Sequence, residues 1–386
     1  MMFSRRTDWN LAPNRLTLAL QEALRQGSKI LDLTISNPTR VGIEYNQSAV
    51  LDALGDPRAL DYDPQPQGVR SAREAVAKYY SSVGDPHRII LTTGTSEGYS
   101  FLFRLLSNPG DEILVPKPSY PLFDFLAELD DVKLVPYSLF YDHLWQIDFH
   151  SLEQAVGEKA RAIVLVHPNN PTGSFVSAQE RLELNAVCRR HNLALIVDEV
   201  FLDYGHDGQV RPTFAANDEV LTFSLSGLSK ISALPQMKLS WIAVSGPPSD
   251  RTPACQRLEV IADTYLSMSA PVQLAAPVLL EQRRSVQPQL MGRVRANLAE
   301  LDRQLGQQKS CSRLNLEGGW YAVLRVPVTR SDEDFAVELV RSRSVLVHPG
   351  HFYDFANEGH LVLSLIAPQE EFRVGVQHLL EFANQT

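Results

Sequence analysis

Residues 162–173 read AIVLVHPNNPTG, an apolar run followed by a turn that two prolines and a glycine restrict. A short apolar run bounded by turn residues is typical of a buried strand. Asn170 stands in the turn, so we expect its amide to project from the end of that strand. Taken alone, the turn is also consistent with a rigid connection that has no chemical role.

The middle of the chain repeats this pattern of apolar runs, and segments with helical periodicity separate most of them. Such alternation predicts a mostly parallel sheet with helices on both faces. Ligands of such sheets bind in the loops at the carboxyl ends of the strands. The expected helices include 98–106, 120–129 and 178–191, and the expected strands are 88–91, 112–115, 132–135, 162–166, 193–197, 220–223 and 241–244.

The pattern changes after about residue 270. Residues 271–305 have the character of one long helix, and three short apolar runs with a further helix follow it. We therefore expect an α/β fold with two domains. A three-layer, mostly parallel sheet would form the large domain, residues 45–270, and a smaller α+β domain would combine residues 1–44 with 271–386.

The composition narrows the classes of function. The 386 residues include 36 Lys and Arg and 45 Asp and Glu, which gives a net charge of −9. An acidic chain without a basic run is a poor candidate for general nucleic-acid binding, and no apolar run reaches the roughly 20 residues of a membrane span. The three cysteines are far apart, which argues against a disulfide scaffold or a zinc site and favours a cytoplasmic protein without a metal.

A second turn that contains glycine lies upstream of the turn that carries Asn170. Residues 91–98 read LTTGTSEG and predict a strand, a tight turn and the start of a helix. A helix amino terminus exposes N–H groups and suits a phosphate, to which Thr95 and Ser96 would add hydroxyl donors. The GTSEG part also matches the turn that carries the nucleophile of a serine hydrolase, with Ser96 as nucleophile and His348 or His360 as its histidine. A tight turn without a ligand is the third interpretation.

Two further strand ends carry charged residues. Asp198 and Glu199 follow the run at 193–197, where a carboxylate is costly unless it meets a cation or hydrogen-bond donors. Lys230 follows the run at 220–223, and a partly desolvated amine loses its proton and becomes a nucleophile that can form a Schiff base. The alternatives are a helix cap or ion pair for the acids and a solvated loop for the lysine.

The three strand ends occur in a characteristic order. Asn170, Asp198 and Lys230 are spaced by 28 and 32 positions, and the glycine turn lies upstream. The combination of N-N-P-T-G, D-E and S-x-x-S-K resembles the fold-type-I pyridoxal-phosphate enzymes, in particular the class I/II aminotransferases, over most of the chain. This resemblance implies pyridoxal 5'-phosphate as cofactor, and an amino donor and a 2-oxo acid as substrates.

The resemblance also implies roles for the matching residues. Lys230 would form the imine with the cofactor aldehyde and, once released, would move the proton between the substrate α-carbon and the cofactor. Asp198 would face the ring nitrogen, and Asn170 would bind the ring 3-hydroxyl. The other implied cofactor contacts are stacking by Tyr120, phosphate binding by Thr95, Ser96, Ser229 and Lys238, and a phosphate contact from Tyr62 of a neighbouring subunit, which implies a homodimer with shared active sites.

Two cofactor-binding positions depart from the family pattern. Lys238 stands where the family usually has arginine, so the charge is kept but the bidentate fork is lost. Phe201 stands where a tyrosine usually donates to the 3-hydroxyl. At Lys238 we expect phosphate binding to survive with altered geometry. At Phe201 one donor to the 3-hydroxyl is lost, which we expect to raise the pKa of the imine that the resemblance assigns to Lys230.

A third departure concerns the substrate. Val362 occupies the position of the arginine that binds the substrate carboxylate in the family. This difference leaves open other chemistry on the same cofactor, by a C–S lyase or a decarboxylase, or a cofactor-binding protein without catalysis. Arg40, which follows Ser36 and Asn37 in the sequence SNPTR, is our candidate substitute for the missing cation, and Arg325 is a second candidate.

Overall fold

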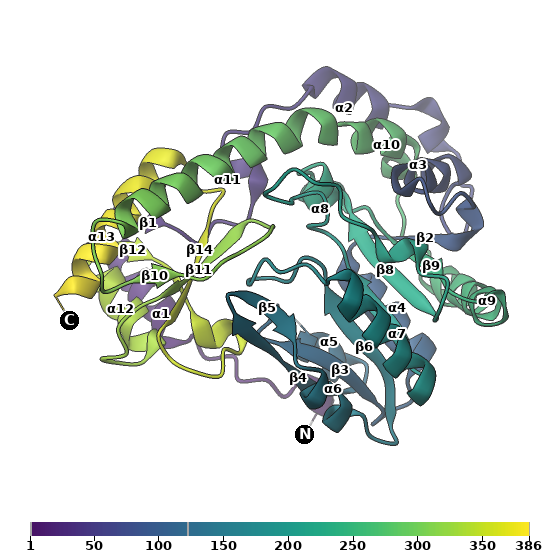
Figure 1. The fold of residues 1–386 in the computed structure, drawn as a ribbon. Coiled ribbons are helices and arrows are strands. Elements are labelled where there is room, and N and C mark those ends of the chain that lie inside the picture. Colours follow the sequence, from purple (N-terminus) through teal and green to yellow (C-terminus); the bar gives the residue numbers. More distant parts are fainter. Residues whose placement is uncertain (1, 122, 386) are drawn as a thin grey trace.

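An eight-stranded sheet is the largest sheet of the computed structural model, which describes residues 2–121 and 123–385 (Figure 1). The five strands in the order β8-β7-β6-β3-β4 run parallel, and the outer strands β2, β9 and β5 pair antiparallel. The expected, mostly parallel sheet is therefore confirmed. The strands are β2 Ile89–Thr92, β3 Glu112–Lys117, β4 Lys133–Asp142, β5 Leu144–Ile147, β6 Ala160–Val166, β7 Ala194–Asp198, β8 Thr222–Gly227 and β9 Ser240–Ser245.

Helices cover both faces of this sheet, which explains why its central strands are apolar throughout. Ala162 and Val164 of β6 pack into a cluster with α4, α5 and α9, whereas Ile163 and Leu165 pack on the other face with α6 and α7. Strand side chains alternate between the faces, so a strand covered on both sides needs apolar residues at every position. These helices are α4 Thr95–Leu106, α5 Phe123–Leu129, α6 Phe149–Ala155, α7 Ala178–His191 and α9 Pro248–Tyr265.

A second group of elements joins the two ends of the chain. Strand β1, Leu31–Asp32, pairs in parallel with β12, Val345–Leu346, and helix α1, Arg15–Arg25, packs against α12, Asp332–Arg343. A four-stranded antiparallel sheet lies in the same core cluster. Its strands are β10 Ser312–Arg313, β11 Tyr321–Arg325, β14 His360–Ser364 and β13 His348–Pro349, and α13 Gln369–Asn384 packs beside them.

The long helix expected over 271–305 is wrong in one respect, because two helices occupy this stretch. Helix α10, Ala270–Glu281, ends before Gln282, and α11, Arg283–Leu305, begins after it. Figure 1 shows α10 beside α2, Gln47–Leu54, and α3, Arg70–Tyr80, while α11 continues toward α13. The apolar periodicity continues through the junction, so only the change of packing partner reveals the break.

Among the described residues, no helix combines the length and the apolar character that crossing a bilayer requires.

Candidate active site

Three neighbouring parallel strands bring three of the predicted side chains to one edge of the sheet. Asp198 is the last residue of β7, and it pairs with Val166 at the end of β6. Asn170 lies in the turn after β6, and Lys230 lies in the short helix α8, Leu228–Ile231, that follows β8. Because the carboxyl ends of parallel strands meet at one edge, these side chains line one cavity of about 240 Å³.

Several other predicted residues line the same cavity, which we call the Lys230 cavity. Strand ends and helix starts from distant parts of the chain therefore converge here. Its polar lining consists of Ser36, Thr95, Ser96, Tyr99, Tyr120, Asn170, Asp198, Ser229, Lys230 and Tyr321, and its apolar lining of Phe123, Leu126, Val166, Val200 and Phe201.

The amine of Lys230 lies in apolar surroundings. Its Nζ is 5.0 Å from the ring centre of Trp320 and 5.6 Å from that of Phe201. Burial lowers the pKa of Lys230 to about 8, although the negative charge of Asp198 acts in the opposite direction. The hydroxyl of Tyr204 donates to the Lys230 carbonyl over 2.7 Å, so this tyrosine holds the backbone of the turn. Near neutral pH a fraction of the amine is therefore unprotonated.

The carboxylate of Asp198 is buried and accepts two hydrogen bonds. The Val200 N–H donates to Oδ1 over 3.1 Å, and the Tyr99 hydroxyl donates to Oδ2 over 3.3 Å. Burial raises the pKa of Asp198 to about 6, while these donors and the charge of Lys230 lower it. A cationic N–H group placed in the cavity beside Asp198 would stabilise the ionised form.

The neighbouring Glu199 has a different environment. It accepts hydrogen bonds of 2.6 Å from the Thr213 hydroxyl and from the Phe214 N–H, and it does not line the Lys230 cavity. Burial raises the pKa of Glu199 to about 7. Of the acidic pair found in the sequence, only Asp198 reaches the cavity, and Glu199 anchors the segment around residue 213.

The two asparagines of the turn after β6 also differ in their hydrogen bonds. The amide oxygen of Asn170 is buried and has no hydrogen-bond partner within the described residues. Buried polar atoms are seldom left without a partner, so this oxygen marks a position for a ligand donor. Asn169 instead donates to the Pro118 carbonyl at 3.0 Å and accepts from the Ser119 hydroxyl at 3.1 Å, which ties the turn to the segment that carries Tyr120.

The glycine turn places a helix amino terminus at the cavity. Helix α4 begins at Thr95 after Gly94, and no side chain of residues 2–121 or 123–385 caps its first N–H groups. A Cβ on Gly94 would lie 3.8 Å from the Nζ of Lys238, so this ammonium stands close to the turn although it does not line the cavity. Free N–H groups, the hydroxyls of Thr95 and Ser96 and a nearby ammonium together suit a phosphate.

Gly98 explains how close α4 comes to the sheet. A Cβ at this position would lie 2.7 Å from Cδ2 of Leu225 in β8. Real Cβ atoms do not approach other carbons so closely, so only glycine allows this helix to pack here without a shift.

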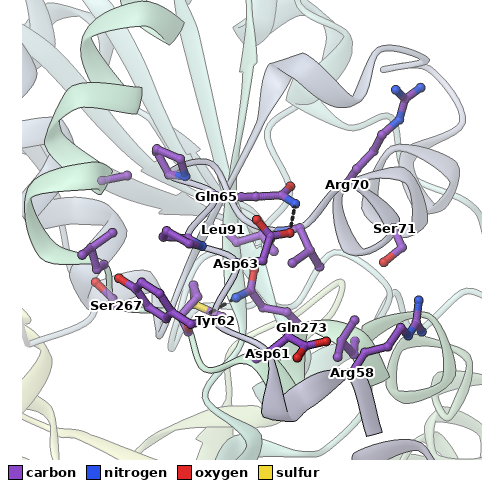
Figure 2. A pocket seen from close by; sticks show the side chains of 18 of the residues that line it. Arg58, Asp61, Tyr62, Asp63, Gln65, Arg70, Ser71, Leu91, Ser267 and Gln273 are labelled. Carbon is purple, nitrogen blue, oxygen red and sulfur yellow. Dashed lines mark hydrogen bonds between the residues drawn. The ribbon is translucent and has the colours of Figure 1, made fainter. Parts of the chain in front are cut away.

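Tyr62 lies apart from the Lys230 cavity. Its side chain is 82% exposed and lines a separate pocket of about 460 Å³ (Figure 2). In Figure 2 its neighbours Asp61 and Asp63 lie in the same loop, where Asp63 accepts a hydrogen bond of 2.7 Å from Gln65. Within one chain, Tyr62 therefore does not reach the cavity.

The three loop residues considered for substrate binding occupy different environments. Ser36 lines the Lys230 cavity, whereas Asn37 caps the short helix Pro38–Arg40 by accepting from the Thr39 N–H at 3.0 Å. Arg40 is exposed and does not line the cavity. The guanidinium of Arg325 stacks over the Tyr141 ring at 5.2 Å.

Two polar residues of the cavity lining were missed by sequence reasoning. Tyr321 belongs to β11, where it is indistinguishable by pattern from a core aromatic, and its hydroxyl hydrogen-bonds to Ser36. Tyr99 lies on the apolar face of α4 and bonds to Asp198. Val362 is fully buried opposite Val323 in the small sheet, and no arginine lines the cavity within the described residues.

The serine-hydrolase alternative receives no support from this geometry. His348 Nδ1 lies 3.0 Å from the Tyr353 hydroxyl, and His360 Nδ1 lies 3.0 Å from the Asn357 carbonyl. Neither histidine lines the cavity that contains Ser96, so neither is arranged as its base.

The residues around the cavity fit pyridoxal phosphate. The unpartnered amide oxygen of Asn170, the buried carboxylate of Asp198 and the uncapped start of α4 correspond to a ring hydroxyl, a ring N–H and a phosphate. The amine of Lys230 suits an aldehyde. Each of these cofactor groups thus has a chemical complement in the cavity.

Comparison with known proteins agrees with this geometry. A family described as "Aminotransferase class I and II" matches residues 29–379. The glutamate-pyruvate aminotransferase AlaA of Haemophilus influenzae is 28% identical over 94% of this chain and 93% of its own length. The alanine aminotransferase of Mycobacterium tuberculosis is 27% identical over 92% of this chain and 86% of its own length.

Solved structures show the same fold. The alanine aminotransferase of Pyrococcus furiosus superposes with a TM-score of 0.89 at 21% identity, and both chains are covered completely. An aminotransferase of Escherichia coli gives a TM-score of 0.88 at 23% identity, over 100% of this chain and 98% of its own. Together with the match along the sequence, these findings show that the chain belongs to the class I and II aminotransferases, pyridoxal-phosphate-dependent enzymes that transfer an amino group between an amino acid and a 2-oxo acid.

Proposed function

We propose that the Lys230 cavity is the site of amino transfer. The observation that carries this proposal is the convergence of Lys230, Asp198 and Asn170 on one cavity beside the uncapped start of α4. When bound there, pyridoxal phosphate supplies an electron sink for the electrons released at the substrate α-carbon. The surrounding residues orient the reactants and move the proton.

Lys230 is the group that handles the proton. Its Nζ takes the proton from the substrate α-carbon, and a pKa of about 8 allows the same atom to accept and release a proton near neutral pH. Asp198 would hold a ring N–H through its carboxylate, Asn170 would bind the ring hydroxyl, and Tyr120 would provide the aromatic contact.

The residues that would hold the phosphate gather around the start of α4. Thr95 and Ser96 add hydroxyl donors to the N–H groups of α4, and Ser229 contributes a hydroxyl from the lysine turn. Lys238 supplies the positive charge, which supports binding without the geometric selectivity of an arginine fork.

We also propose a homodimer in which Tyr62 reaches the phosphate of the neighbouring subunit. An exposed tyrosine beside exposed Leu60 is a suitable interface anchor, since aromatic and apolar side chains are enriched in the centre of such contacts. Sedimentation of the Tyr62→Ala variant, combined with its cofactor affinity, tests this assignment. An unchanged affinity in an intact dimer would contradict it.

For the substrates we propose alanine and glutamate as donors, with pyruvate among the acceptors. Relatives named alanine and glutamate-pyruvate aminotransferase support this choice, as does a small cavity whose apolar wall includes Leu126 and Val200. Because Val362 offers no cation, we assign carboxylate binding to the segment of Ser36, Asn37 and Arg40. Ser36 lines the cavity, Asn37 fixes the turn as a helix cap, and Arg40 brings the cation of this segment although it lies outside the cavity.

A cytoplasmic location and the two-domain division are also proposals. Free cysteines at 188, 255 and 311 are compatible with a reducing compartment. The proposed division is 45–270 against the combined segments 1–44 and 271–386, and most of the core cluster of the second group comes from those segments. Because α10 packs with α3, we move the proposed boundary from residue 270 to Gln282.

Borohydride reduction tests the central assignment. Peptide mapping of the reduced, cofactor-loaded protein should find a pyridoxyl group on Lys230, and an exposed lysine such as Lys78 serves as the internal control. A protein that gains no adduct after reconstitution would contradict the proposal. Half-reactions with alanine and glutamate should then show amino transfer. With an S-substituted cysteine, release of a thiol together with pyruvate and ammonia would instead indicate a C–S lyase, and release of carbon dioxide from any amino acid of a test panel would indicate a decarboxylase.

A further inference from the structure

A second and larger cavity lies outside the Lys230 cavity. Its volume is about 1080 Å³, and it opens between the end of α3, the segment that follows β7, and the first half of α11. We call it the arginine cleft, because Arg181, Arg211, Arg283, Arg284 and Arg295 line it. None of these arginines lines the Lys230 cavity.

The charge of the arginine cleft is opposite to that of the whole chain. Five arginines and a single acid, Asp203, line it, whereas the chain carries a net charge of −9. Glu281 pairs with Arg283 at 2.6 Å and with Arg284 at 2.7 Å. One carboxylate is thus shared by two guanidinium groups, and a positive excess remains.

Arg181 is one source of this excess. Its guanidinium stacks over the Phe214 ring at 4.5 Å and donates to the Thr213 carbonyl at 3.1 Å. No carboxylate of the described residues lies within ion-pair distance of it, and burial lowers its pKa, although Glu199 and Glu219 act in the opposite direction from farther away. A partly buried cation without a paired anion is costly unless a ligand supplies the charge.

Arg211 and Arg295 add unused donors. Arg211 pairs with Asp207 at 2.7 Å, but its Nε is buried and has no partner among the described residues. Arg295 is exposed at the rim and forms no hydrogen bond or ion pair with the described residues. The cleft therefore offers a ligand the exposed guanidinium of Arg295, while Arg211 keeps one buried N–H that the described residues do not satisfy.

We propose that the arginine cleft binds a small metabolite with two or more negative groups, carboxylate or phosphate. The planar fork of a guanidinium matches both groups, and several arginines at one cavity favour a ligand of multiple charge over a single anion. The Tyr79 ring, 5.6 Å from the Arg283 guanidinium, provides one apolar surface beside these charges.

The cleft also touches the element that carries Lys230. Gln287 lies in its wall and donates both to Asp203 at 2.7 Å and to the Ile231 carbonyl at 3.0 Å. Gln287 thus links the wall of the cleft to the lysine turn by one hydrogen bond.

Calorimetry on the cofactor-loaded protein tests the proposal, because the phosphate position near Thr95 is then filled. Pyrophosphate and citrate are the two probes, and acetate at equal ionic strength is the control for non-specific charge effects. We expect saturable binding of at least one probe, with little or no binding of acetate. Comparison of the two probes separates a phosphate ligand from a carboxylate ligand.

Two variants locate the binding. Arg181→Gln and Arg295→Gln should each weaken binding about tenfold, the typical effect of losing a charge-assisted hydrogen bond. Arg257→Gln removes one exposed arginine of α9 outside the cleft and should leave the affinity unchanged. Since Arg295 forms no bond with the described residues, its variant should fold normally. No binding at millimolar probe, or equal affinities in all three variants, would overturn the proposal.

Discussion

Asp198 and Lys230 face the same cavity, and each favours the charged form of the other, while burial opposes the charge of both. Burial raises the pKa of Asp198 to about 6 and lowers that of Lys230 to about 8. Between pH 6 and pH 8 both groups are largely ionised, although burial disfavours the charged form of each. The pair is therefore a place where stability is sacrificed to keep two reactive groups available.

Asp198→Asn should stabilise the cofactor-free protein while it abolishes transamination. The folded pKa of Asp198 lies above its unfolded value, so protonation favours folding, and this contribution is lost as the pH rises through about 6. At pH 8 the variant avoids the cost of a buried carboxylate, and we expect a gain on the order of 1–2 kcal/mol after allowing for the lost attraction to Lys230. Thermal melting from pH 4 to 8 measures it.

The control for this prediction is Asp52→Asn, since Asp52 is exposed on α2. Its melting temperature should follow that of the unmodified protein at every pH. The gain in Asp198→Asn should shrink as the pH falls below 6. A variant that is less stable at pH 8 than at pH 4, relative to the parent, would contradict the argument.

The adjacent asparagines should respond in opposite ways to substitution. Asn170→Ala removes an amide oxygen without a partner, so the cofactor-free protein should keep its stability, while cofactor affinity should fall about tenfold. Asn169→Ala removes hydrogen bonds to Pro118 and Ser119 and should destabilise the protein by about 1–3 kcal/mol. Denaturant unfolding without cofactor and fluorescence titration with cofactor separate the two effects. Equal stability losses would show that Asn170 has a structural partner.

Gly98→Ala tests the close approach of α4 to the sheet. The new Cβ would lie 2.7 Å from Cδ2 of Leu225, so either this buried side chain or α4 must shift, and we expect a loss of about 1–3 kcal/mol. Gly292→Ala on α11 is the matched control, because nothing lies within 4 Å of its Cβ position. That variant should be more stable by about 0.5–1 kcal/mol through helix propensity. Urea unfolding measures the change in the free energy of unfolding of both variants. A change of the same sign in both would contradict the packing argument.

Lys238 should act through its charge. Lys238→Ala should weaken cofactor binding about tenfold, and the difference from the parent should shrink at high salt because the ammonium is exposed. Lys238→Arg should restore or improve the affinity, since it keeps the charge and adds the fork. Titration of the cofactor-free protein with pyridoxal phosphate at two salt concentrations measures both variants. An unaffected alanine variant would remove Lys238 from the phosphate site.

Much of the Lys230 cavity could be predicted without coordinates. Asn170, Asp198 and Lys230 each end an apolar run, and parallel strands must place their carboxyl ends at one edge of the sheet. The glycine turn with Thr95 and Ser96 was recognisable for a similar reason, because a helix start after a strand lies at that edge as well.

Which of two adjacent, chemically similar side chains enters the cavity could not be predicted in the same way. Asn169 and Asn170 have the same chemistry and stand next to each other, yet Asn169 bonds to Pro118 whereas the amide oxygen of Asn170 has no partner in the described part of the chain. Asp198 and Glu199 differ in the same way: Asp198 accepts from the Val200 N–H and lines the cavity, whereas Glu199 accepts from the Phe214 N–H outside it. Which side chain turns into the cavity depends on the segment packed against it, and that segment is distant in sequence.

The sequence by itself determined the parallel sheet, the lysine turn and the order of the strand-end residues, because each depends on local periodicity and on short motifs. Only the tertiary structure decided the break between α10 and α11, the place of Tyr321 and the gathering of five arginines in one cleft. These features arise where elements remote in sequence pack together, and packing partners are set by the whole three-dimensional arrangement of the chain and not by any local pattern.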